Sequence, residues 1–171
     1  MKNILLSLIC FALSQIPVMA QAAEGGTNPD QDFVTLAAQT DMTEAHLGKL
    51  AQTQGTAQAI KDLGQMLATD HTSDYTQLST IATKAGLTVP KGIDSKHEKM
   101  IAPFEKLNGQ AFDRRYAQTM AKGHEEAIAA YKKEASDGQN ADLKAYAQQT
   151  LPTLEKHLKA AQDAGRAKTS I

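Results

Sequence analysis

The chain contains no tryptophan, a single cysteine among 171 residues, and aromatic residues that make up only 5 % of its length. Its apolar content therefore depends on Ala, Leu and Met, which favour helices. A formal net charge of -1 gives no electrostatic basis for binding nucleic acid or an anionic membrane surface. Glycine-rich phosphate loops and the patterns GxSxG, CxxC and HExxH are also missing from the sequence. These absences do not decide whether the protein is an enzyme, but they favour a binding or structural role.

The first 22 residues have the pattern of a signal peptide. Lys2 gives a positive start, residues 4–16 form an apolar run, and Ala20-Gln21-Ala22 fits an AxA cleavage site. Cleavage after Ala20 and an uncleaved anchor are the alternatives. We expect export to the periplasm or secretion, and loss of Cys10 with the signal peptide. The mature chain then contains no transmembrane segment, no disulfide and no thiol chemistry.

The remaining sequence predicts an all-α domain. Residues 23–28 are expected to be a flexible leader, residues 29–165 a helical domain, and residues 166–171 a disordered tail. Apolar spacing and capping residues predict four long helices and one short one, at about 29–54, 56–85, 95–107, 110–136 and 140–165. The short helix lies in the connection between the second and third long helices. That connection either crosses the length of a ferritin-like four-helix bundle or forms an embellished hairpin, and the sequence leaves both open.

Each long helix carries one ionisable residue on its apolar face. The face of the first helix recurs in steps of three and four residues, through Phe33, Ala37, Thr40, Glu44, Leu47 and Ala51. The other three helices place a histidine in the equivalent position: His71, His124 and His157. All four residues fall near the middle of their helices, and we expect them to meet inside the bundle.

Two interpretations of this predicted cluster remain open. Three imidazoles and a carboxylate suit one zinc, copper or iron ion, with Asp74 and Asp113 orienting the histidines from outside. Alternatively, the histidines and carboxylates form a purely structural hydrogen-bond network. A di-iron centre of the ferritin type is not expected, because its Glu-x-x-His pairs are missing from the sequence.

Several motifs together resemble a bacterial family catalogued as domain of unknown function 4142. They are Phe33-Val34, Glu44 with Leu47-Gly48, Asp70-His71, Gly109-x-x-Phe112-Asp113-x-x-Tyr116, His124, and Thr150-Leu151-Pro152-x-Leu154-x-x-His157. They span about residues 30–162. The resemblance implies a ferritin-like helical fold and a periplasmic or cell-surface location, and it brings no activity, cofactor or catalytic residues.

These observations lead to three functional hypotheses. The first is an exported bundle that binds a metal ion or small ligand at Glu44, His71, His124 and His157 without turnover. The second is an interaction or stress-protection protein, with a protein partner or a second copy of itself, whose polar core is structural. The third is a mononuclear metal oxidoreductase or hydrolase, for which the sequence offers no dedicated nucleophile or substrate pocket.

Overall fold

A computed structural model describes residues 28–167 of the chain, which form five helices and no strand. The helices are α1 (Pro29–Gln54), α2 (Gln58–Lys84), α3 (Ser95–Glu105), α4 (Gly109–Asp137) and α5 (Ala141–Arg166). Their bounds lie within a few residues of the predicted ones, and the all-α prediction is confirmed. The predicted signal peptide, nearly all of the leader and most of the tail lie outside the described residues. No described helix has a stretch long and apolar enough to cross a membrane.

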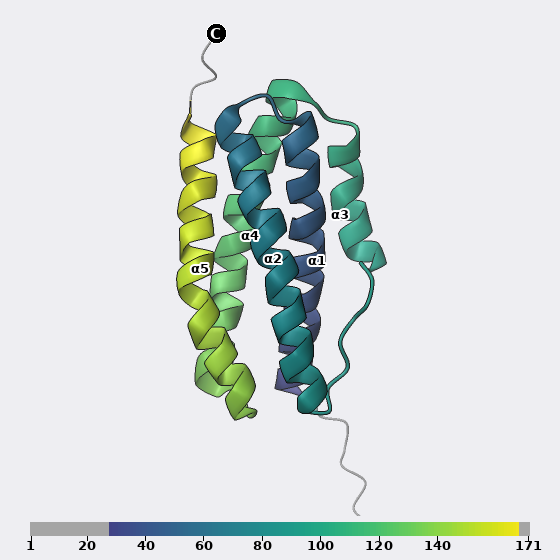
Figure 1. The fold of residues 1–171 in the computed structure, drawn as a ribbon, viewed down its shortest axis with the longest axis vertical. Coiled ribbons are helices and arrows are strands. Elements are labelled where there is room, and N and C mark those ends of the chain that lie inside the picture. The colour runs from purple at the N-terminus through teal and green to yellow at the C-terminus, as the bar shows by residue number, and fades with distance from the viewer. Residues whose placement is uncertain (1–27, 168–171) are drawn as a thin grey trace, which may run out of the picture.

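The four long helices stand side by side as a bundle, and α3 lies against its outside (Figure 1). Helix α1 packs against α2 and α4, and α5 packs against α4 and α2. Each of these neighbouring pairs is antiparallel, because α1 and α5 run up the bundle in Figure 1 whereas α2 and α4 run down. Helices α2 and α4 are therefore parallel, and the chain must travel the length of the bundle between them.

Two glutamines of α1 hold this crossing connection in place. The Gln31 side chain donates to the carbonyl of Thr88 over 2.8 Å and accepts from the Thr88 N–H over 2.9 Å. About two helical turns further along, Gln39 donates to the carbonyl of Gly92 and accepts from the N–H of Asp94. The connection therefore runs along α1, and the structure decides for the crossover over the hairpin.

Helices α1 and α2 approach each other closely at two glycines. A Cβ atom at Gly48 would lie 2.6 Å from the Gly64 carbonyl oxygen, and one at Gly64 would lie 2.6 Å from the Ala51 Cβ. Contacts this short do not occur, so both positions need glycine for the helices to pack at this distance. Gly48 is one turn beyond Glu44, and the contact therefore sets the distance across which α1 and α2 bring their polar residues together.

The apolar core consists of two clusters, one toward each end of the bundle. The cluster nearer the start of α1 contains Phe33, Leu78, Tyr131 and Tyr146, and the other contains Leu47, Ile60, Phe112 and Tyr116. On each long helix, the ionisable residue of the predicted cluster lies between the stretches that supply the two apolar clusters. These residues are Glu44, His71, His124 and His157. A layer of polar side chains thus divides the core at mid-height.

A buried aspartate closes each end of the bundle. Asp113 of α4 accepts from the backbone N–H groups of Thr56 and Ala57, both over 2.9 Å, in the loop between α1 and α2. Asp30 of α1 accepts from those of Gln139 and Asn140 in the loop between α4 and α5. Ala57 is the N-cap residue of α2, and no side chain caps this helix. The loop instead relies on a carboxylate from another helix.

We expect Asp113→Ala to lower the free energy of unfolding by about 1–3 kcal/mol, because it leaves two loop amides without their acceptors. Urea denaturation measures the change. Asp30→Ala should behave similarly at the other end, whereas Asp62→Ala on the exposed face of α2 should change stability by less than about 0.5 kcal/mol. An Asp113 variant as stable as the Asp62 variant would contradict this role.

Glu134 makes the stability of the protein depend on pH at the Asp30 end. Burial, and then the neighbouring charge of Asp30, raise the pKa of Glu134 to about 7, and its Oε1 atom has no hydrogen-bond partner among the described residues. The folded protein therefore keeps a proton that the unfolded chain loses near pH 4.5. Between these values the folded state binds more protons, so stability falls as the pH rises.

Glu134→Gln should remove the loss of stability that accompanies rising pH. The variant is expected to melt a few degrees higher than the original protein at pH 8 and to show no gain at pH 4, where the carboxyl is protonated in both states. Thermal melts followed by circular dichroism at the two pH values provide the test, with the exposed Glu155→Gln as control. An equal shift at both pH values would mean that the effect does not come from ionisation.

Candidate metal centre

The four predicted residues meet in the polar layer. Glu44 comes from α1, His71 from α2, His124 from α4 and His157 from α5, and all four are buried. One ring nitrogen from each of the three histidines lies within 4.8 Å of the others. Glu44 Oε2 lies 3.0 Å from His71 Nε2 and 3.4 Å from His124 Nε2. His157 Nδ1 is 3.2 Å from His124 Nε2. The cluster thus joins all four long helices at one point.

Each histidine is oriented by an acceptor on the side away from this point. His71 Nδ1–H donates to Asp41 Oδ1 over 2.9 Å. His124 Nδ1–H donates over 2.9 Å to the carbonyl oxygen of Met120, one turn earlier in α4. His157 Nε2–H donates to Asp70 Oδ2 over 2.9 Å. The outward nitrogen of each ring is therefore engaged, and the inward nitrogen faces the shared centre.

The charges of the cluster are coupled. Burial alone would lower the pKa of His71, but the carboxylates of Glu44 and Asp41 outweigh it and raise the pKa to about 10. Burial alone would raise the pKa of Glu44, yet the neighbouring His124 and His71 hold it below its usual value. Burial raises the pKa of Asp41 to about 6. At neutral pH, the cluster thus contains a protonated His71 between two carboxylates.

His157 differs from His71 because it is neutral. Burial, with the positive charge of the neighbouring histidines, lowers its pKa to about 4. The one proton of the neutral ring lies on Nε2, since that atom donates to Asp70. Its Nδ1 therefore presents a lone pair to the centre, and an imidazole binds a metal ion through such a lone pair.

Two buried polar atoms face each other at the centre. His71 Nε2 and Glu44 Oε2 form an ion pair at 3.0 Å, and neither atom has another hydrogen-bond partner within residues 28–167. A metal ion that takes the place of the Nε2 proton of His71 would bind both atoms.

The spacing of the inward atoms also fits a metal ion. Four ligand atoms arranged as a tetrahedron at zinc bond lengths of about 2.0–2.1 Å are separated by about 3.3 Å. Three of the six separations between the inward atoms are 3.0, 3.2 and 3.4 Å. The close group of possible ligands consists of the three histidines, and Glu44 contacts two of them, His71 and His124. Three nitrogens and one carboxylate oxygen form a donor set that zinc, copper and iron all accept. The residues present therefore fit a single transition-metal ion.

The structure places the two aspartates that were predicted to orient the histidines, Asp74 and Asp113, in different parts of the bundle. Asp74 does lie beside His71, in a second close group of possible ligands with Asp41. Asp113 does not belong to the cluster, and this prediction is wrong. Its carboxylate is bound to the loop between α1 and α2. Eleven residues separate it from His124, about 16 Å along the helix.

The sequence did not assign any of the three acceptors that orient the rings to a histidine. Asp41 lies three residues before Glu44 and shares its buried face, so helical spacing could have revealed it. Asp70 lies off the apolar face of α2, yet it reaches His157 because α2 packs beside α5. The Met120 carbonyl has no sequence signal.

Fold and site together define an all-α helical bundle with a buried histidine and carboxylate cluster that could hold a metal ion. The chain belongs to the family described as Domain of unknown function (DUF4142), which matches residues 16–164. This match confirms the resemblance found in the sequence motifs. No curated protein and no solved structure matches the chain.

Proposed function

We propose that this protein is exported to the periplasm and binds one transition-metal ion in its core, through Glu44, His71, His124 and His157. The observation that carries the proposal is the convergence of three buried histidine nitrogens at ligand spacing, with the Glu44 carboxylate in contact with two of the rings. The apolar start of the chain and its AxA site support export. The crossing connection supports a ferritin-like assignment of the bundle.

The outer acceptors support a metal centre of high affinity. A metal-binding histidine usually donates its other N–H to a carboxylate or carbonyl, which fixes the ring and makes its lone pair more basic. Asp41, the Met120 carbonyl and Asp70 do this for the three rings. A bound ion would supply Lewis-acid chemistry or, if copper or iron, electron transfer. The chain itself supplies a closed set of ligands, which favours retention of the ion over turnover.

Calorimetric titration of the metal-free protein tests the proposal. We expect one Zn²⁺ or Cu²⁺ ion per chain with a dissociation constant below micromolar, because structural zinc sites bind with about 10–16 kcal/mol. His124→Ala should abolish binding at micromolar concentration. His97→Ala is the matched control, since His97 pairs with Asp94 on α3, away from the cluster. Absence of binding by the original protein, or equal binding by the His124 variant, would refute the proposal.

One observation favours a second function, in which the cluster is structural. The pKa of His71 near 10 means that a proton already balances Asp41 and Glu44 without a metal ion. In that case the layer fixes the register of the four helices, and the protein acts through a partner. Added metal ions and chelators would then leave the melting temperature unchanged.

A further inference from the structure

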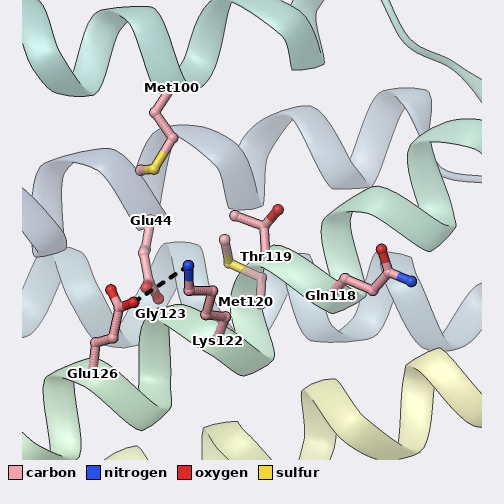
Figure 2. A pocket seen from close by; sticks show the side chains of 8 residues that line it. All are labelled: Glu44, Met100, Gln118, Thr119, Met120, Lys122, Gly123 and Glu126. Atoms are coloured by element: carbon pink, nitrogen blue, oxygen red, sulfur yellow. Dashed lines mark ion pairs between the residues drawn. The ribbon is translucent and has the colours of Figure 1, made fainter.

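Two hollows lie against the outside of the bundle beside Glu44. They have volumes of about 360 Å³ and 500 Å³ and share four lining residues: Glu44, Met100, Gly123 and Glu126. These residues come from α1, α3 and α4, so the hollows form one groove between these helices, which we name the Glu44 groove. Figure 2 shows Met100 on one side of Glu44, with Gly123 and Glu126 on the other.

Glu44 belongs to both the groove and the metal centre. Its side chain lines both hollows, and its Oε2 atom faces His71 and His124. The three histidines are at most 1 % exposed. Their outward nitrogens are bound to Asp41, the Met120 carbonyl and Asp70. Of the four ligands, Glu44 is therefore the one that connects the inward atoms to the groove.

Gly123 leaves room beside this carboxylate. A Cβ atom there would lie 3.1 Å from Glu44 Oε1, closer than an ordinary contact. The absence of a side chain at Gly123 therefore leaves space beside Glu44 Oε1.

The charges along the groove favour cations. Besides Glu44, three acidic side chains line it, against two lysines: Asp32, Asp94 and Glu126 against Lys96 and Lys122. The Lys122 ammonium lies 3.6 Å from Glu126 Oε1, an exposed pair that is drawn as a dashed line in Figure 2. A groove lined with an excess of one sign of charge concentrates ions of the opposite sign.

We infer that the Glu44 groove is the route by which a transition-metal cation enters and leaves the core, with Glu44 passing the ion to the histidines. This inference rests on the proposed metal centre. Met100 of α3 lies at the opening of the route and is 40 % exposed. Its thioether is a soft ligand suited to copper.

The matched alternative is a hollow on another face of the bundle. It has a volume of about 340 Å³, lies between α1, α2 and the crossing connection, and is lined by residues that include Met42, Asp41 and His71. There the outward nitrogen of His71 is closed by Asp41. We expect no ion to pass on this side.

Stopped-flow absorbance of Co²⁺ binding to the metal-free protein distinguishes the two hollows. Met100→Trp should fill the Glu44 groove and slow both association and dissociation by about tenfold, with an unchanged dissociation constant, because it adds a barrier to both directions. Met42→Trp fills the other hollow and should leave both rates unchanged. As a second variant, Glu126→Lys should lower the association rate most at low ionic strength.

Unchanged rates in Met100→Trp, or slower rates in Met42→Trp, would overturn the route while leaving the metal centre intact. The route would also be overturned if Met100→Trp changed the dissociation constant, because a barrier on the route slows association and dissociation by the same factor. Failure of the original protein to take up Co²⁺ would instead refute the metal centre, and the route with it.

Discussion

Replacing His71 by alanine is expected to lower the free energy of unfolding of the metal-free protein by about 3–5 kcal/mol, the usual cost of removing one partner from a buried ion pair. His71 is 1 % exposed and lies between Asp41 and Glu44, at 2.9 Å and 3.0 Å. Without the imidazole, both carboxylates remain buried and lose their nearest positive charge. This is the largest effect that we expect from a single substitution in the polar layer.

The loss should depend on pH in a defined direction. The pKa of His71 is about 10 in the folded protein against 6.5 in the unfolded chain. A raised pKa means that the folded state holds the proton more tightly, so the stabilisation is complete below pH 6.5 and disappears as the pH rises through about 10. The difference between the original protein and His71→Ala should therefore narrow between pH 7 and pH 10.

Urea denaturation across this pH range, with chelator present, measures the difference. The control is His97→Ala, which removes a histidine that pairs with Asp94 on α3 and should cost less than about 1 kcal/mol. If His71→Ala and His97→Ala were equally stable, the charges of the layer would not be coupled as described.

Saturating Zn²⁺ should raise the melting temperature of the original protein by about 10 °C. A ligand at a thousand times its dissociation constant stabilises a folded protein by about 4 kcal/mol, and each kcal/mol shifts the melting temperature of a chain of this size by about 2–4 °C. The shift should be larger at pH 8 than at pH 6. Zinc must displace the proton that His71 holds up to about pH 10. The affinity for zinc therefore falls by about tenfold for each unit by which the pH is lowered.

Differential scanning calorimetry with Zn²⁺, and then with excess chelator, provides the measurement. The shift should be reversed by the chelator and be absent in His157→Ala. Asp70→Asn should retain a smaller shift, because Asp70 only orients His157 through Nε2. A zinc shift of the same size in His157→Ala would place the ion elsewhere on the protein.

Helical spacing was sufficient to predict most of the fold. Steps of three and four residues in the sequence identify one buried face per helix. The three histidines on those faces do converge, and Glu44 contacts two of them. Spacing is less exact about which of two adjacent residues is buried. It placed Thr40 in the core, whereas the structure buries Asp41 almost completely and leaves Thr40 partly exposed.

Contacts between distant segments could not be predicted in this way. Asp113 lies on the buried face of its helix as expected, but its height places it beside a loop and not beside His124. The crossing connection depends on the amides of Gln31 and Gln39, which bond backbone groups more than fifty residues away. Such polar contacts leave no periodic signal in the sequence.

We propose that one ion occupies the layer formed by Glu44, His71, His124 and His157. Elemental analysis of the protein, purified without chelator or affinity tag, tests this proposal most directly. We predict close to one zinc, copper or iron ion per chain, and almost none in His71→Ala. A metal-free protein whose melting temperature does not respond to added ions would contradict the claim and make the histidines structural.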